Sequence, residues 1–265
     1  VAAANPNPNP QPGTPSYAAW TGPGWFDMGD TSTLTLSGSL ITGVANKRSG
    51  GPALAAAGAS ISSVANGRNG RAVARFVRNT NNPARLSPVG EPADAISAVS
   101  QGDDKPFTVL AVYVPLGPDT GYVWSWSRTV DANNSQQVAL IRRTTSTSVR
   151  RQVVEATSND RSWGGQAADV ARIVAVKHTG TQVSAWDTSL AKAVDAVAQD
   201  VAAFSSQMTF LIGTSRSFGA STTGYAGPAM AMDLCEIIIE AEAKADADIQ
   251  QAISDLAAKW GITLA

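Results

Sequence analysis

Cysteine and histidine are almost missing from this chain of 265 residues, which holds one of each. Cys235 has no partner for an internal disulfide, and its place in the apolar run MAMDLCEIII predicts a buried thiol. His178 follows the strand-like run ARIVAVK and has no second imidazole for a zinc site or a catalytic relay. No CxxC pair and no glycine-rich phosphate loop is present. We therefore expect a structural or surface role for His178 and no cofactor.

Charge and long hydrophobic runs are also scarce. Charged residues make up 15% of the chain, and 20 basic residues nearly balance 21 acidic ones. That balance gives no net field for nucleic acid or an anionic membrane. No apolar stretch approaches the roughly 20 residues that span a bilayer, and no signal-peptide pattern is seen. We expect a soluble protein without nucleic-acid or membrane partners.

Proline, by contrast, is concentrated near the beginning of the sequence. Residues 1–19 include NPNPNPQPGTP, with prolines at Pro6, Pro8, Pro10, Pro12 and Pro15. Proline removes backbone donors and favours an extended path, so this segment cannot be a core element. We expect an anchoring arm over 1–19, docked on a neighbouring subunit or on a groove of its own domain, and one folded domain over 20–265.

Short apolar segments separated by turn residues fill most of the remaining chain. They include TLTLSG, ARFV, FTVLAVYV, GYVWSWS, QVALIR, VRRQVV, ARIVAVK, QVSAW, MTFLIG and CEIII. Their close spacing, without long amphipathic helices between them, predicts an all-β, two-sheet antiparallel sandwich. The segment 189–203 fits either a helix or a long loop and stays unassigned.

One helix is predicted, at about 246–260. Apolar residues recur there at steps of three and four, namely Ile249, Ile253, Leu256, Ala257 and Trp260. Acidic residues in the first turn, Lys259 in the last and Gly261 as a stop complete the pattern. We expect this helix to pack on the sandwich.

Several motifs resemble concanavalin A-like, laminin-G-like jelly rolls found in bacteriophage virion proteins. They are WFDMGDTSTLTLSGSLI, NGRNGRAVARF, PFTVLAVYV, FLIGTSRS and CEIIIEAEAKADADIQQAISDLAAKWGI, and the resemblance covers Trp20 to Ile262. The chain departs from the family at Ala245, where a capping serine is common, and at 241–243, where a Tyr-Asn-Arg-like turn is usual. The resemblance implies two curved sheets that bind carbohydrate, decorate a virion or, in some members, hydrolyse glucans.

Hydrolysis of a glycan requires two carboxyl groups beside the scissile bond. Glucanases of this fold place three acidic residues at alternate positions of one strand, and the nearest match is Glu236-Ile237-Ile238-Ile239-Glu240. Ile238 occupies the middle position, so we expect no enzyme. We expect Ile237 and Ile239 to face the core and the two glutamates to meet solvent or a neighbour.

An aromatic platform for a sugar is suggested by one predicted strand. Tyr122, Trp124 and Trp126 alternate there and should share a face, with Arg128 nearby to bond hydroxyl or carboxylate groups. The alternative is that this face is core. Trp163, in the loop-like stretch NDRSWGG, is a separate candidate.

Four arginines flank a predicted hairpin centred on Ser146 and Thr147. That register sets Arg142 opposite Arg151 and Arg143 opposite Arg150, so like charges would face each other. We interpret the hairpin as a docking tip for an acidic partner or polysaccharide, against the alternative of a solvated hairpin.

Four aspartates offer oxygen ligands for calcium, namely Asp27, Asp30, Asp103 and Asp104, but their spacing fits no known loop and turn capping explains them equally. The leading hypothesis is a non-catalytic virion surface protein, a decoration or fibre component in multiple copies, that is anchored to other subunits and binds host glycans. A stand-alone lectin module and a divergent glycan hydrolase remain the alternatives.

Overall fold

The structure is a computed structural model. It describes residues 13–79, 81–91, 93–101, 105–118, 120–131, 134–143, 146–152, 159–164, 167–199, 208–215 and 229–265, with only the backbone for 129–131, 134, 135 and 152. Within them lie seventeen strands, and every pairing between strands is antiparallel. The predicted all-β sandwich is confirmed.

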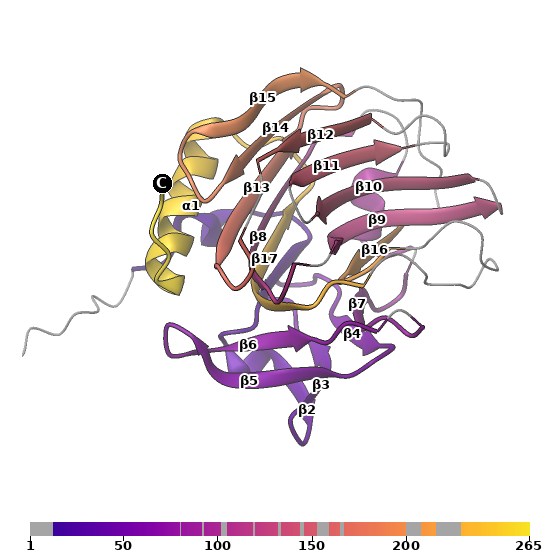
Figure 1. Ribbon diagram of the computed structural model, residues 1–265, viewed down its shortest axis with the longest axis vertical. Coiled ribbons are helices and arrows are strands. Elements are labelled where there is room, and N and C mark those ends of the chain that lie inside the picture. Colours follow the sequence, from indigo (N-terminus) through magenta and orange to yellow (C-terminus); the bar gives the residue numbers. More distant parts are fainter. Residues whose placement is uncertain are drawn as a thin grey trace, which may run out of the picture.

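The strands form two facing layers (Figure 1). What we call the helix layer contains, in spatial order, β1 (Gly24–Asp27), β17 (Met232–Glu240), β8 (Phe107–Pro115), β13 (Arg172–His178), β14 (Gln182–Asp187) and β15 (Lys192–Ala198). The front layer contains β7 (Arg85–Pro88), β16 (Thr209–Ile212), β9 (Gly121–Asp131), β10 (Asn134–Arg142), β11 (Thr147–Gln152) and β12 (Asn159–Trp163). The remaining strands connect the layers, namely β2 (Leu34–Ser37), β3 (Leu40–Val44), β4 (Leu54–Ala57), β5 (Ile61–Arg68) and β6 (Arg71–Phe76).

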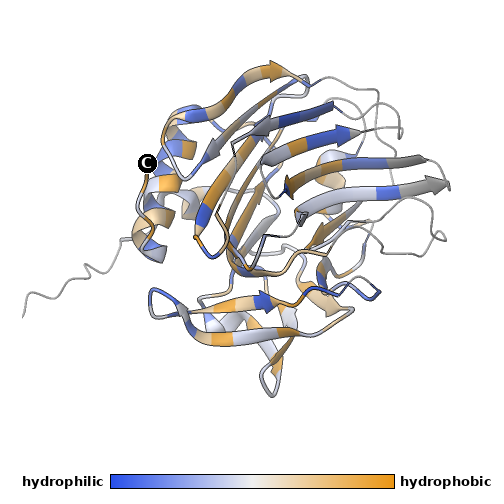
Figure 2. Ribbon diagram, viewed as in Figure 1, coloured by the Kyte–Doolittle hydropathy of each residue, from blue (hydrophilic) through white to orange (hydrophobic). Residues whose placement is uncertain are grey.

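The space between the layers holds the main core. β17 illustrates the alternation that builds it, because Ile237 and Ile239 face this core, as predicted, whereas Ile238 points to the opposite side. Figure 2 shows hydrophobic residues on β8 and β17 in the interior and hydrophilic stretches on β11 and β12. The outer side of the front layer is therefore polar, although most of its central side chains are buried, while the outer side of the helix layer is apolar and needs a cover.

That cover is helix α1 (Asp246–Trp260), whose bounds match the prediction. The predicted apolar stripe is buried against the helix layer in a second core that also contains the free thiol of Cys235. Gly261 ends the helix with φ of 60°, and Ile262 N–H donates to the Ala257 carbonyl. The expectations of a packed helix and a buried cysteine are confirmed.

The described residues also include three single-turn 3₁₀ helices, η1 (Ser16–Ala19), η2 (Thr31–Thr33) and η3 (Ser97–Ser100). η1 packs against α1, and Tyr17 is fully buried there. Residues 16–19 therefore belong to the folded domain, although the sequence placed them in the arm. The unassigned segment 189–203 contains the edge strand β15, which a positive φ at Ala196 distorts.

The beginning of α1 lacks a side-chain cap, because Ala245 occupies the N-cap position. Ala245→Ser supplies an oxygen for an orphan amide, and we expect the free energy of unfolding to rise by about 1 kcal/mol. Ala247→Ser, an exposed change within the first turn, is the matched control and should not stabilise. Urea unfolding of both variants measures the difference, and equal shifts would contradict the capping argument.

Candidate functional site

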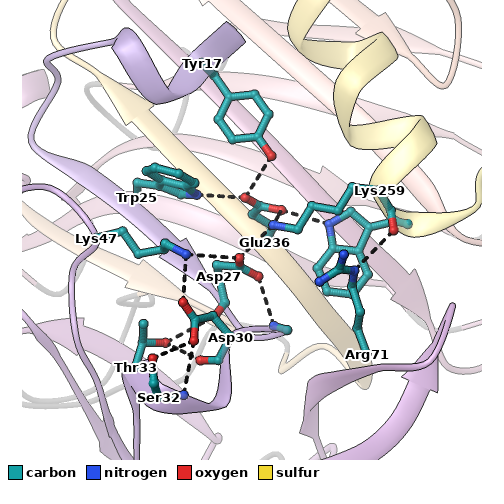
Figure 3. A network of polar contacts seen from close by, with 12 residues as sticks. Tyr17, Trp25, Asp27, Asp30, Ser32, Thr33, Lys47, Arg71, Glu236 and Lys259 are labelled. Carbon is teal, nitrogen blue, oxygen red and sulfur yellow. Dashed lines mark hydrogen bonds and ion pairs between the residues drawn. The ribbon is translucent and has the colours of Figure 1, made fainter. Parts of the chain in front are cut away.

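Glu236 of β17 lies at the centre of a buried polar network (Figure 3). One carboxylate oxygen accepts hydrogen bonds from Trp25 Nε1 at 2.7 Å and Tyr17 Oη at 3.2 Å. The other accepts from Lys259 Nζ at 2.7 Å and Trp260 Nε1 at 2.8 Å. Burial raises the pKa of Glu236, and the Lys259 ammonium opposes that shift. These donors occupy both oxygens and tie η1, β1, β17 and α1 together.

An ion-pair chain continues from this carboxylate toward the surface. Lys259 Nζ also bonds Asp27 at 2.7 Å, and Lys47 Nζ lies 3.6 Å from Asp27 and 2.8 Å from Asp30. The hydrogen bonds from Lys47 and Ser32 hold the pKa of Asp30 at about 2. The chain thus alternates positive and negative groups from the buried glutamate outward.

Glu240, the second glutamate of the strand, is also buried. It accepts from Gly22 N–H at 2.9 Å and pairs with Arg48 and Lys244, each at 3.4 Å. The expectation that the two glutamates meet solvent is therefore wrong. Both face the helix side of the sheet, where the segment before β1 and α1 supply the polar partners that a buried carboxylate requires.

Two cavities flank Trp25. One, of about 820 Å³, is lined by Trp20, Pro23, Arg48, Glu240 and other residues of 18–25, 47–51 and 240–242. The other, of about 490 Å³, lies toward α1 and is bordered by Gly13 to Pro15, where the proline-rich segment joins the domain. Neither cavity could be predicted from the sequence, because each is lined by residues from distant parts of the chain.

The predicted aromatic platform does not form. Trp124 and Trp126 are fully buried in the core between the layers, and Trp126 Nε1 donates to the Ile96 carbonyl at 2.8 Å. A register shift in the β9–β10 ladder separates Tyr122 from the two tryptophans and turns it to the outer side with Ile141. The alternative of a core face therefore holds for the two tryptophans.

Arg128 and Trp163 were also predicted ligand contacts. Arg128 is half-buried in β9 at a position that alternates with Ser127, on the side of Trp126. Trp163 lies in strand β12 instead of a loop, packs against the core edge and donates its Nε1 hydrogen to Asp187 at 2.7 Å. Neither side chain lies on the outer face of the front layer.

The arginine hairpin has a different register from the predicted one. Arg142 pairs with Thr147 in the ladder, Arg150 with Ala139, and Arg151 with Val138. The prediction failed because the turn falls before Ser146, whose carbonyl accepts from Arg143 N–H at 2.7 Å.

The four guanidinium groups therefore do not form one cluster. Arg142 and Arg151 are buried, and they donate to the Gly117 and Gly180 carbonyls at 2.6 and 2.7 Å. Arg143 and Arg150 remain together and share Asp160, at 2.6 Å for Arg143 and at 2.8 and 2.9 Å for Arg150. The predicted cluster of four like charges is therefore wrong. His178 is buried beside Arg151, which fits its expected structural role.

The outer side of the front layer carries a set of polar side chains that we call the outer polar face. Its members are Tyr122, Ser125, Ser127, Gln137, Ser148, Arg150, Asp160 and Thr209. Ladder neighbours place them together, since Ser148 lies opposite Ile141, Ser127 opposite Gln137 and Thr209 opposite Ser127. Tyr122 Oη lies 3.3 Å from Gln137 Oε1, to which it donates.

Three polar atoms of the outer polar face are buried without a hydrogen-bond partner. They are Gln137 Nε2, Ser148 Oγ and Thr209 Oγ1. Buried polar atoms are rarely left unpaired, because each costs about 1 to 3 kcal/mol. The sequence reasoning singled out Tyr122, Arg143 and Arg150 but missed these three. The alternating serines of GYVWSWS were the available signal, since they share the face opposite Trp124 and Trp126.

The aspartates proposed for calcium do not come together as ligands in the described part of the chain. Asp27 and Asp30 pair with lysines, and Asp103 and Asp104 lie outside the described residues. Among the described residues, no group of three or more His, Cys, Asp or Glu side chains is arranged to hold a metal ion. Pro6, Pro8, Pro10 and Pro12 also lie outside the described residues. No helix in the described ranges is long and apolar enough to cross a membrane.

The architecture defines the chain as an antiparallel jelly-roll sandwich with one covering helix. No protein-family model and no curated protein matches it. Solved structures with a similar fold include a Trypanosoma rangeli sialidase in complex with sialic acid, at 11% identity and a TM-score of 0.55, covering 87% of this chain and 32% of the sialidase chain. Another is a botulinum neurotoxin type C structure whose title reports cell entry through two ganglioside molecules, at 10% identity and a TM-score of 0.55, covering 84% and 50%.

A third similar structure is the CBM40 module of the Ruminococcus gnavus IT-sialidase, at 8% identity and a TM-score of 0.51. That match covers 66% of this chain and 91% of the module. At these identities the comparisons establish the sandwich fold, and function has to be argued from the site.

The Glu236 network predicts a large stability loss on a nearly isosteric change. Glu236→Gln replaces an acceptor oxygen by an amide that cannot accept from Lys259 or an indole N–H, so the free energy of unfolding should fall by roughly 3 to 5 kcal/mol. Glu242→Gln is the control, because Glu242 is 58% exposed and its loss should change stability by less than about 0.5 kcal/mol. Denaturant midpoints measure both, and a small effect at Glu236 would show that the network is not an anchor.

The depressed pKa of Asp30 predicts a defined acid dependence. Asp30 stabilises the fold while ionised, so its contribution is present above its usual pKa and is lost as the pH falls toward about 2. Asp30→Asn should lower stability at pH 7 and flatten the decline between roughly pH 4 and pH 2. Unfolding midpoints at several pH values test this. Parallel curves for the two proteins would contradict the assignment.

Proposed function

We propose that this chain is a non-catalytic, glycan-binding jelly roll that its proline-rich segment attaches to a larger particle, such as the surface of a virion. The observation that carries the binding part is the outer polar face. Hydroxyl and amide groups lie there buried on one side of the sheet beside the partly exposed pair Arg150 and Asp160, and three of the buried atoms have no partner. A saccharide offers many hydroxyl groups that both donate and accept, so it can supply the missing hydrogen bonds.

Charge on the same face supports a sugar with polar or weakly acidic groups. Arg143 and Arg150 share the single carboxylate of Asp160, which leaves one guanidinium charge in excess. Arg143 has a side chain that is 38% exposed and can reach a ligand at the rim. The solved structures with this fold add support, since their titles name sialic acid and gangliosides.

A binding role fits better than catalysis because of how the two glutamates of β17 are held. Glu236 accepts four hydrogen bonds from four side chains, and Glu240 meets Arg48, Lys244 and a backbone amide. A general acid or nucleophile needs a free oxygen beside the substrate. The carboxylates of Glu236 and Glu240 stabilise the fold instead.

Attachment to a particle is supported by how the proline-rich segment joins the domain. Ser16 N–H donates to Asp255 at 2.6 Å, and Tyr17 is locked to Glu236. A force applied to residues 1–12 would therefore be transmitted through Ser16 and Tyr17 to α1 and β17. We propose that Pro6, Pro8, Pro10 and Pro12 contact other subunits and that the protein acts in multiple copies, where weak glycan contacts add up.

Removal of an unpartnered hydroxyl separates binding from stability. Ser148→Ala should leave the free energy of unfolding unchanged or raise it, because Ser148 Oγ has no partner to lose. The same change should weaken glycan binding by about tenfold if a sugar hydroxyl bonds that atom. A glycan array to find the ligand, followed by calorimetry on wild type and variant, makes the measurement.

The neighbouring residue supplies a matched control. Thr147 Oγ1 is also buried without a partner, but Thr147 alternates with Ser148 and faces the interior side of the layer. Thr147→Val should therefore leave both stability and glycan affinity near wild type. Equal glycan affinities for Ser148→Ala and Thr147→Val would argue against the outer polar face as the binding surface.

A further inference from the structure

We propose that the 820 Å³ cavity beside Trp20 and Trp25, called here the tryptophan cavity, binds the Asn-Pro segment 5–12 of a second copy of this chain. This inference rests on the proposed function, for which it names the attachment partner. The cavity lies on the helix side of the sandwich and is separate from the outer polar face, so the two sites can be tested independently.

The lining of the tryptophan cavity suits a polyproline-type ligand. The buried Trp20 and the partly exposed Trp25 both line it, with Lys47 and Arg48 over the Trp25 ring and Lys244 over the Trp20 ring. Gly22, Gly50, Gly51 and Pro23 add small side chains to the wall. Grooves lined by aromatic residues recognise extended proline-rich segments, whose conformation is already restricted and whose carbonyl groups are free to accept hydrogen bonds. The segment NPNPNPQP supplies four prolines in eight residues.

Charge favours a neutral occupant. Lys47 pairs with Asp30 at 2.8 Å, and Arg48 pairs with Glu240 at 3.4 Å and donates to the carbonyls of Tyr17 and Ala18 at 2.7 and 2.9 Å. The two cations that line the cavity are therefore neutralised within the domain, and an anionic ligand would have to break these pairs.

The proline-rich segment meets this requirement. Residues 1–26 contain no charged side chain, and the asparagines between the prolines carry amide donors. Glu242 on the cavity rim is 58% exposed and pairs with Lys244 through one oxygen, so its other oxygen can accept from such an amide. A neutral, proline-rich and amide-bearing segment thus suits a cavity that is lined by tryptophans and whose charged groups are already paired.

A second copy is a better donor than the chain's own segment. The segment joins the domain at Gly13 to Pro15, which line the other cavity, and Ser16 fixes it to Asp255 on α1. Pro15 is extended, with φ of −64° and ψ of 149°. The described root of the segment is therefore held at the other cavity, whereas a segment from a neighbour is not tied to that position.

The test uses self-association of the full chain with two complementary variants. Ala95→Arg places a long side chain into the cavity from an exposed position, and the fourfold change of Pro6, Pro8, Pro10 and Pro12 to Ala weakens the segment. Wild type should associate with rising concentration in sedimentation velocity, and each variant should associate about tenfold more weakly or worse. An equal mixture should recover one contact per pair, because one variant retains a working segment and the other a working cavity.

Two controls make the result specific. Ala191→Arg introduces the same residue at an exposed position that lines neither of the two cavities beside Trp25 and should associate like wild type. Ser49→Trp blocks the cavity from its other side and should reproduce Ala95→Arg if both proteins melt like wild type.

Several outcomes would overturn the inference. Wild type that stays monomeric at every concentration, unchanged association in both cavity variants, or no recovery in the mixture would each do so. Glycan affinity measured on the same samples distinguishes the two ideas. Normal glycan binding without self-association would leave the proposed binding function intact and remove only the tryptophan cavity as the dock.

Discussion

The carboxylate of Glu236 is the group on which the rest of the structure depends. A buried charge is costly unless it is fully paired, and here it meets two indoles, a phenol and an ammonium. Those donors come from η1 and β1 near the beginning of the described chain and from α1 near its end. The requirement to satisfy one carboxylate therefore fixes η1, β1 and α1 against β17 at the same time.

That constraint divides the molecule into two sides with different roles. On the helix side, hydrogen bonds and ion pairs engage the carboxylates of Glu236 and Glu240, and the root of the proline-rich segment is built into the network. On the front layer, the outer polar face keeps buried atoms without partners. Under the proposed function, the first side holds the domain and its proline-rich segment, and the second side offers hydrogen bonds to a ligand.

The features that could be predicted from the sequence are those set by local periodicity. The stripe from Ile249 to Trp260 defines α1, and the alternation in CEIIIE correctly turned Ile237 and Ile239 to the core. The environment of Glu236 could not be predicted, because its four donors lie 23 to 219 residues away along the chain.

The register between neighbouring strands was the other feature that could not be predicted from the sequence. A shift in the β9–β10 ladder moved Tyr122 off the face of Trp124, and the hairpin turn before Ser146 separated the four arginines. Strict alternation of side chains cannot predict a bulge. The strands were therefore identified correctly, but Tyr122 was assigned to the wrong face and the hairpin arginines to the wrong partners. The outer polar face could not be predicted from the sequence, because its residues come from several strands and only the register between those strands brings them together.

The central claim is that the outer polar face binds a glycan, and the most direct measurement is a crystal structure of the chain with its tightest ligand from a glycan array. The account predicts sugar hydroxyls within hydrogen-bond distance of Gln137 Nε2 and Ser148 Oγ. A glycan seated instead in the cavity beside Trp20, or on the helix side near Glu236, would contradict it.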